Sequence, residues 1–354
     1  MLPDGNYYYY ILWLVFGLFV GAALAIDLGV ISKMRFRRKE STSSSKIPDQ
    51  ENCPVQEEIG TNITFRRALH WTIAWISLAG VFALIIYLGR GYGSLLEFVS
   101  AYTLEKSLSV DNMFVFAIIF SSLAIPHKYQ HKVLFLGILG AISMRIPLIL
   151  AGTTLLENFH WMLYVFGGLL LVTALRMALQ RREKETIDIK RNVAVRLLRR
   201  LVPITSTLRE DKFLFRSTRG VLYATPMLVA LVVVELTDLI FAMDSIPAVL
   251  AITTDPFIVI TSNIFAILGL RSLYFLLAGL MDRFYYLKPA LIALLVLVGA
   301  KMLFSDFYKI PIEASLAAIF AILGSAVGLS IAKTRIGDKN ALKNKQQSDK
   351  DNKR

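Results

Sequence analysis

The sequence predicts an all-α polytopic membrane protein with about nine transmembrane helices, and three observations lead to this fold class. The chain has 354 residues, of which 55% are hydrophobic, and its mean hydropathy of +0.57 is too high for an ordinary soluble domain of this length. Nine segments are long and apolar enough to cross, or nearly cross, a hydrocarbon core that needs about 20 helical residues. Basic residues gather in alternate connections between these segments.

The nine predicted spans follow one another along the chain with connections of different length. They lie at residues 7–31, 71–89, 95–123, 132–152, 161–179, 221–252, 257–280, 288–304 and 312–332. The first span opens with four tyrosines and has Trp13 one turn later, which is typical of an aromatic belt at a membrane interface. It has no basic leader and no small-residue cleavage site, so we expect a retained helix and not a signal peptide.

The basic residues predict how the chain is oriented in the membrane. One set of alternate connections, with the C-terminal tail, holds 32 of the 39 Lys and Arg residues, whereas the other set holds only Arg90 and Lys309. Because cytoplasmic loops carry the excess of Lys and Arg, we expect the N-terminus outside and the C-terminus in the cytoplasm. The remaining five, Lys106, Arg145, Arg176, Arg271 and Lys301, fall within or at the ends of predicted spans.

The long connections divide the chain into membrane and cytoplasmic parts. The first span, residues 1–31, is followed by a basic, serine-rich loop (32–70), spans two to five (71–180), a basic loop (181–220), spans six to nine (221–332) and a basic tail (333–354). The first loop and the tail are predicted to be disordered, and the second loop could form a basic amphipathic helix on the membrane surface.

The charge and cysteine content narrow the possible partners. The net charge of +13 lies in loops and tails, so we expect anionic membrane lipids as its partner, and no nucleic acid. A single cysteine, Cys53, excludes a disulfide or a zinc–thiolate site within one chain.

An internal repeat relates the third to fifth spans to the sixth to eighth. The segments LEKSLSVDNMF (104–114) and TDLIFAMDSIP (237–247) align Glu105 with Asp238, Asp111 with Asp244, and Asn112 with Ser245. Farther on, Arg145 aligns with Arg271 and Arg176 with Lys301. Each unit has three helices, so the two copies enter the membrane from opposite sides, which predicts an inverted repeat with a site near the midplane.

The carboxylates of the third and sixth spans are the candidate metal site. A charged side chain at bilayer depth costs about 2.5–3.5 kcal/mol, so such residues are usually functional. Hard oxygen donors without histidine or thiolate favour Mn²⁺, Mg²⁺ or Ca²⁺. The predicted ligands are Glu105, Asp111, Asn112, Glu235, Asp238 and Asp244, with Asp27, Ser245, Arg145, Arg271, Arg176 and Lys301 in supporting positions.

Helix geometry limits this interpretation. Asp244 lies about 120° around a regular helix from Asp238, so we expect the sixth span to kink or unwind between Asp244 and Pro247, where a backbone hydrogen bond is missing. The alternative is structural: the carboxylates could form ion pairs with the intramembrane arginines and lysine. In the transporter interpretation the five intramembrane basic residues could neutralise the empty pathway, with Arg145 and Arg271 as equivalent choices in the two repeats.

The two motifs EKSLSVDNMFVFAIIF and VELTDLIFAMDSIPAVLAI resemble the signatures of the TerC family of integral membrane proteins, named for tellurium resistance. The resemblance implies a bacterial inner-membrane protein, or a plastid one, with bacterial members linked to manganese export. It matches the family's acidic positions to Glu105, Asp111, Glu235, Asp238 and Asp244, and to Asp27 in the first span. Members have also been connected with tellurite resistance, calcium, alkaline response and thylakoid biogenesis.

We therefore expect a secondary transporter that exports Mn²⁺ from the cytoplasm, coupled to protons, with the metal as transported ion and no tightly bound cofactor. The alternative is a membrane scaffold, biogenesis or tellurite-resistance factor without metal transport of its own. An enzyme is not expected, because no residue has the setting of a nucleophile and no histidine lies within the spans.

Overall fold

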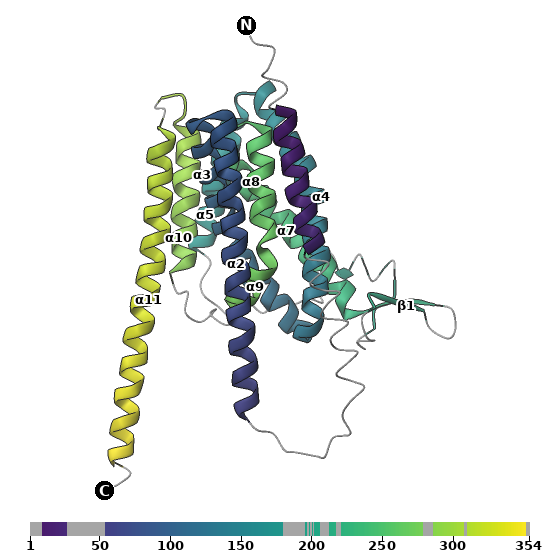
Figure 1. The fold of residues 1–354 in the computed structure, drawn as a ribbon, viewed down its shortest axis with the longest axis vertical. Coiled ribbons are helices and arrows are strands. Elements are labelled where there is room, and N and C mark those ends of the chain that lie inside the picture. Colours follow the sequence, from purple (N-terminus) through teal and green to yellow (C-terminus); the bar gives the residue numbers. More distant parts are fainter. Residues whose placement is uncertain are drawn as a thin grey trace. The chain divides into compact units, whose positions relative to one another are not determined.

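A computed structural model describes residues 9–26, 54–179, 195–196, 198, 200, 202–205, 212–216, 221–278, 286–307 and 310–351. The chain divides into two compact units, Met1–Leu95 and Leu96–Arg354. Helices dominate both units (Figure 1).

The first unit contains a helix at Tyr9–Ile26 and helix α2 (Pro54–Arg90). The two pack as an antiparallel pair: the rings of Phe16 and Phe82 have centroids 5.9 Å apart, and Leu12 lies against Gly89. Because α2 begins at Pro54, the predicted disordered loop of residues 32–70 is helical over its last part. Gly91, with φ +87°, separates α2 from the next helix in a conformation that favours glycine.

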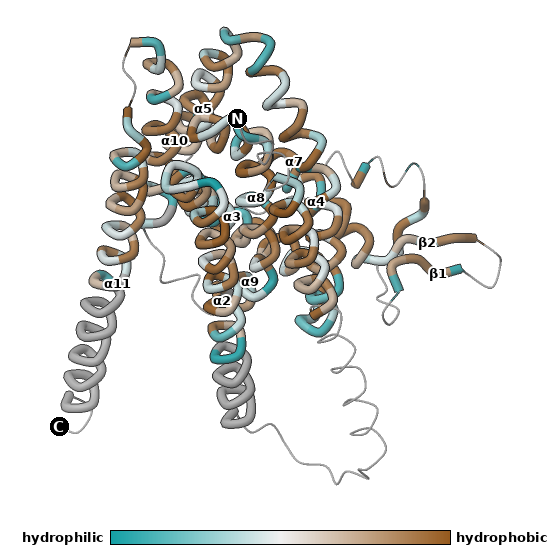
Figure 2. The backbone as a smooth tube through the Cα atoms, turned by 45° about the horizontal axis from the view of Figure 1, so that its top comes forward, coloured by the Kyte–Doolittle hydropathy of each residue, from teal (hydrophilic) through white to brown (hydrophobic). Residues whose placement is uncertain are grey.

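The second unit contains most of α3 (Tyr92–Ser122) and all of the later elements. Its helices are α4 (His127–Asn158), α5 (Met162–Leu179), α7 (Pro226–Leu250), α8 (Pro256–Leu268), α9 (Leu270–Ala278), α10 (Leu287–Leu303) and α11 (Ile312–Asp351). Helix α4 packs against α7 and α8, α5 packs against α10 and α7, and α10 packs against α11. Apolar residues run along all of these helices (Figure 2).

The number of spans is only partly confirmed. Within the described residues, six helices are long and apolar enough to cross a membrane, and the α8–α9 pair, bent by 44°, makes a seventh candidate. Helix α10 has only 17 residues. Helix α3 is not among the six, because every 18-residue window of it contains at least three charged residues, and some of these are the candidate site residues themselves. Nine spans and the inverted repeat stay predictions.

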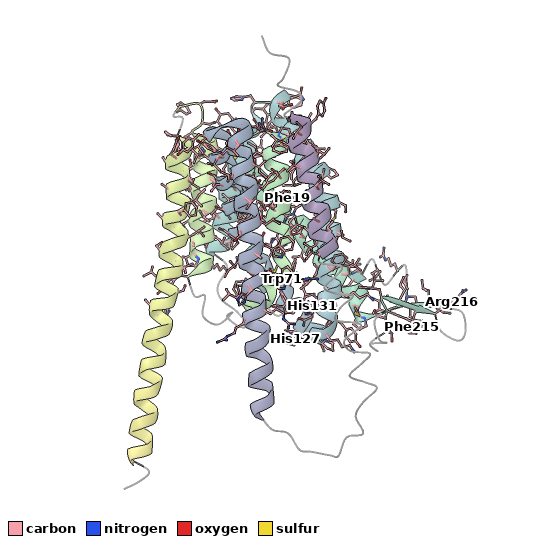
Figure 3. The ribbon with its side chains drawn as sticks, viewed as in Figure 1. Phe19, Trp71, His127, His131, Phe215 and Arg216 are labelled. Atoms are coloured by element: carbon pink, nitrogen blue, oxygen red, sulfur yellow. The ribbon has the colours of Figure 1, made fainter. Side chains whose placement is uncertain are left out.

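One further prediction about the segments outside the predicted spans differs from the structure. The tail predicted to be disordered, residues 333–354, is helical to Asp351 because α11 continues past its apolar part into a stretch rich in good helix formers. In the basic loop 181–220, the described residues of the predicted amphipathic helix, Val195, Arg196, Leu198 and Arg200, are helical, with Val195 buried and both arginines exposed. A hairpin of β1 (Leu214–Arg216) and β2 (Leu222–Ala224) follows them. The rings of Phe215 and Tyr223 stack across the two strands, and such cross-strand aromatic pairs stabilise a sheet. Figure 3 shows Phe215 and Arg216 on the first strand of this hairpin.

The hairpin is attached firmly to the start of α7. The backbone N–H of Thr225 and its hydroxyl both donate to Phe213 O, at 3.0 Å each. Pro226 then opens α7, where its missing N–H costs nothing. These hydrogen bonds fix the position of the first turn of α7, the helix that carries Glu235, Asp238 and Asp244.

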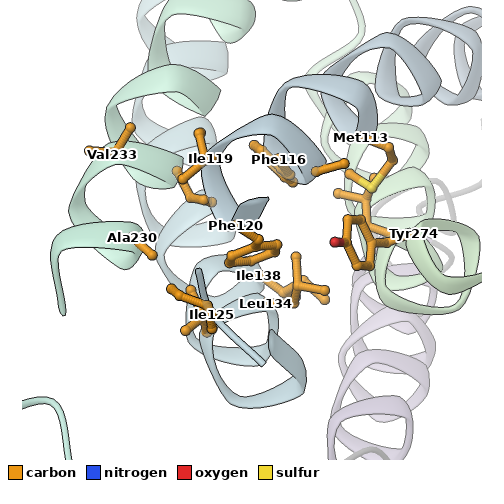
Figure 4. Close-up of a cluster of buried hydrophobic side chains, with 14 of the residues drawn as sticks. Met113, Phe116, Ile119, Phe120, Ile125, Leu134, Ile138, Ala230, Val233 and Tyr274 are labelled. Carbon is orange, nitrogen blue, oxygen red and sulfur yellow. The ribbon is translucent and has the colours of Figure 1, made fainter. Parts of the chain in front are cut away.

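A large apolar core lies near one end of the second unit. It joins α3, α4, α7 and α9 through closely packed side chains such as Phe120, Ile138, Val233 and Tyr274 (Figure 4). Tyr274 also donates a hydrogen bond to Gln130 on α4 at 3.1 Å. This packing holds the four helices in the rotation that brings their polar residues together.

Candidate functional site

Glu105 and Asp238, one carboxylate from each sequence motif, contact the same arginine. Arg145 on α4 donates from Nη1 to Glu105 Oε2 on α3 at 3.0 Å. It also donates two hydrogen bonds to Asp238 on α7, from Nε to Oδ2 at 3.1 Å and from Nη2 to Oδ1 at 3.0 Å. All three residues are at most 3% exposed. Bidentate pairing of this kind is the strongest contact an arginine makes with a carboxylate.

Asn263 on α8 completes this network. Its Nδ2 donates to Glu105 Oε1 at 2.7 Å, and its Oδ1 accepts from Arg145 Nη1 at 3.3 Å. The residue is fully buried. Four helices therefore contribute one polar side chain each to a cluster of Glu105, Arg145, Asp238 and Asn263, which we call the arginine cluster.

Glu235 lies one turn before Asp238 on α7 and faces α4 at Gly140. A Cβ on Gly140 would stand 2.1 Å from Glu235 Oε1, so the carboxylate fits there only because residue 140 is glycine. Its Oε2 is buried and has no hydrogen-bond partner among the described residues. A buried carboxylate oxygen without a donor is costly, and this one lies next to the arginine cluster.

Asp244 lies elsewhere. Its Oδ1 accepts a hydrogen bond from Thr173 on α5 at 3.0 Å, and the nearby charge is that of Arg176. The expected unwinding between Asp244 and Pro247 is wrong, because α7 is helical without a break to Leu250, whereas a kink there stays a prediction. Pro247 cannot donate a backbone hydrogen bond to residue 243, but it lies in the last turn, so the helix loses only one bond near its end. On an unbroken helix Asp244 points away from the face of Asp238.

The remaining predicted residues occupy several places. Asn112 and Ser245 are buried, and Ser245 Oγ lies near Glu105 without the geometry of a hydrogen bond. Arg271 on α9 interacts electrostatically with His131, and Lys301 on α10 is half-buried. Asp27 and the side chain of Asp111 lie outside the described residues.

In the arginine cluster the guanidinium of Arg145 takes the position between the two carboxylates that a metal ion could otherwise occupy. Among the described residues, no group of three or more His, Cys, Asp or Glu side chains is placed to hold a metal ion. The guanidinium stands between Glu105 and Asp238 instead. Arg145 was predicted only as one of two equivalent choices, and Asn263 and Gly140 were not predicted. The one signal for Asn263 is an amide inside the apolar run FIVITSNIFAIL.

Comparison with known proteins identifies the family. The model of the family described as "Integral membrane protein TerC family" matches residues 91–340, which contain both motifs. This chain belongs to the TerC family. An "Uncharacterized membrane protein STKORF319" of Myxococcus xanthus is 46% identical over 324 residues, covering 92% of this chain and 93% of that protein.

Two other relatives also match most of this chain. The "Putative membrane-bound redox modulator Alx" of Escherichia coli (strain K12) is 46% identical over 269 residues, which is 74% of this chain and 83% of that protein. An "Uncharacterized membrane protein" of Rickettsia bellii (strain RML369-C) is 35% identical over 327 residues, covering 92% of this chain and 99% of that protein. No solved structure matches the chain.

Proposed function

We propose that this TerC family protein is a secondary transporter that exports a divalent metal ion, above all Mn²⁺, from the cytoplasm across a bacterial inner membrane in exchange for protons. The observation that carries the proposal is the arginine cluster: two buried carboxylates from the two sequence motifs, joined by one guanidinium. Charged groups are too costly at this depth to be kept without a purpose.

In this proposal Arg145 serves as the counter-ion of the empty site. It neutralises one of the two carboxylates that it contacts, so an arriving cation meets one net negative charge and that of Glu235 close by. A divalent ion that takes the place of the guanidinium would gain the oxygens of Glu105, Asp238 and Asn263. These hard donors suit Mn²⁺, Mg²⁺ and Ca²⁺, and Mn²⁺ is favoured by the manganese export linked to bacterial TerC members.

Proton coupling follows from the excess of carboxylates. Several carboxylates around one divalent ion overcompensate its charge, and some must be neutralised when the ion leaves. We propose that Glu235 takes up the proton when no metal ion is bound, since one of its buried oxygens has no hydrogen-bond partner among the described residues. Asp111 and Asp244 are proposed to act farther along the pathway, with the N-terminus outside and the C-terminus in the cytoplasm.

Reconstituted protein tests the proposal directly. Proteoliposomes containing an Mn²⁺ indicator and a pH indicator should show Mn²⁺ flux with opposite proton movement, and parallel runs with Ca²⁺ and Mg²⁺ should rank the three ions. Glu105→Gln and Asp238→Asn should each abolish flux, whereas Glu157→Gln, at the exposed end of α4, should not. Wild-type flux in both cluster variants, with folded protein, would rule out this site.

A membrane scaffold or biogenesis factor is the second candidate, and one observation favours it. The arginine cluster already satisfies Glu105 and Asp238 without a metal, as a purely structural core would. Shortening the basic loop within residues 181–194 spares Val195, which belongs to the apolar core, and the backbone bonds of Pro203 and Thr205 to Ala224 in the hairpin. A transporter should keep Mn²⁺ flux after this deletion and keep lowering cell manganese in a sensitive host, whereas a scaffold should lose its cellular effect.

A further inference from the structure

Lys106 is an intramembrane cation that the arginine cluster does not use. It follows Glu105 on α3, yet its Nζ points to another partner and donates to the backbone oxygen of Ala266 on α8 at 3.2 Å. No described carboxylate lies within 4.0 Å of this ammonium. A lysine at membrane depth without an acidic partner needs another source of stabilisation.

The acceptor lies at a break between two helices. Helix α8 ends at Leu268, α9 begins at Leu270, and the two axes differ by 44°. Ala266 belongs to the last turn of α8, where carbonyl groups lack amide donors within the helix. It is fully buried, so no water is at hand to satisfy its oxygen. These carbonyls also form the negative end of the helix dipole.

We propose that Lys106 is a tethered cation that fills a monovalent-cation site at the C-terminal end of the half-helix α8. Carbonyl oxygens at the ends of broken membrane helices can coordinate Na⁺ or similar ions. Here the ammonium supplies the same charge from α3 and donates to the same kind of oxygen. The wild-type protein therefore needs no Na⁺ or K⁺ at this position.

This site is separate from the arginine cluster, although both tie α3 to α8. Glu105 contacts Asn263 in the middle of α8, whereas Lys106 contacts Ala266, three residues nearer the break. The proposal concerns the ion that stabilises the bend and does not depend on transport of a divalent metal. Its test therefore uses thermal stability with no divalent metal present.

The experiment compares full-length wild type with Lys106→Ala, Lys106→Met and Lys106→Arg in nanodiscs. Melting temperature is measured in choline chloride and in NaCl or KCl at equal ionic strength. Wild type and Lys106→Arg should show the same melting temperature in all three salts. Lys106→Ala should melt lower in choline and recover by roughly 2–4 °C as Na⁺ or K⁺ saturates the emptied site.

Lys106→Met controls for general salt effects, because its side chain fills the space of the lysine stem without a charge. It should melt lower than wild type and should not respond to Na⁺ or K⁺. An equal response of the Ala and Met variants, or no response of Lys106→Ala to either ion, would overturn the proposal. Should Lys106→Ala not fold, Lys106→Ser leaves nearly the same space and is held to the same criteria.

Discussion

Two helix interfaces of the second unit are built in opposite ways. Between α5 and α10 the backbones touch: a Cβ on Gly167 would stand 3.0 Å from Gly299 O, and a Cβ on Gly299 would stand 3.0 Å from Gly167 O. Between α4 and α7 the apolar packing is joined by charged side chains, with Arg145 bonded to Asp238 and the Glu235 carboxylate against Gly140. Small residues that allow close backbone approach are typical of static membrane interfaces.

The difference indicates which interface can rearrange. Backbone atoms in contact leave no room for adjustment, and at one end of the α5–α10 pair Asp306 adds hydrogen bonds to Tyr164 and His160. A guanidinium and a carboxylate can exchange partners by rotating side chains, with the helices in place. We therefore regard α5–α10 as the framework and α4–α7 as the interface where an ion is exchanged.

Removal of the guanidinium should have the largest effect. Arg145→Met leaves two buried carboxylates without a counter-ion, and loss of one partner from a buried ion pair costs about 3–5 kcal/mol. Melting in nanodiscs measures the loss, with Arg176→Met, on an exposed arginine of α5, as matched control. If both variants were equally stable, Arg145 would not be the group that holds the α4–α7 interface together.

Gly299→Ala probes the framework interface. The added methyl meets Gly167 O at 3.0 Å and Leu170 Cβ at 3.2 Å, neither of which can move without the backbone. We expect a loss of about 1–3 kcal/mol, as for overpacking in other cores. Gly168→Ala is the control, because its Cβ would meet nothing within 4 Å. Gly299→Ala should have a lower melting temperature than Gly168→Ala, and both should keep the ion selectivity of the wild type. A change of selectivity in Gly299→Ala would contradict the framework role.

Gly140→Ala probes the other interface by displacing a charge. The methyl collides with the Glu235 carboxylate, which can swing away because it is the end of a flexible side chain. Stability should change little, but Mn²⁺ should bind up to about tenfold more weakly, which is about 1.4 kcal/mol of binding free energy. Gly137→Ala, whose Cβ would be 3.5 Å from its nearest neighbour, controls for the added methyl. Equal Mn²⁺ affinities in flux assays of the two variants would exclude Glu235 from the ion's path.

The sequence alone was enough to predict that Glu105 and Asp238 lie within helices and to single them out as site candidates, because charges inside apolar runs are conspicuous. It could not choose between Arg145 and Arg271, since that choice depends on how α4 and α9 are rotated by the apolar packing around Tyr274. It also placed Asp244 in the same shell as Asp238, which needed a broken helix that the structure does not have.

Asn263 and Gly140 were beyond sequence reasoning for a different reason. An amide and a glycine are both common in membrane helices, so neither stands out until a neighbour is known. The role of Gly140 depends on Glu235, 95 positions away, and that of Asn263 on Glu105, 158 positions away. Only the folded arrangement relates such residues to the charges they serve.

The smallest expected effect is at Thr173, and it tests whether α7 carries one site or two. Thr173→Val removes the hydrogen bond to Asp244, worth about 0.5–1.5 kcal/mol at most in a half-buried setting. Thr154→Val, which loses only a bond to its own helix backbone, is the control. If Asp244 forms a separate ion site beside α5, Thr173→Val should lower Mn²⁺ flux slightly. Its effect on the free energy of unfolding should then add to that of Asp238→Asn. A coupling energy well above about 0.5 kcal/mol between the two variants would instead place both aspartates in a single site, because only residues that share partners depart from additivity by that much.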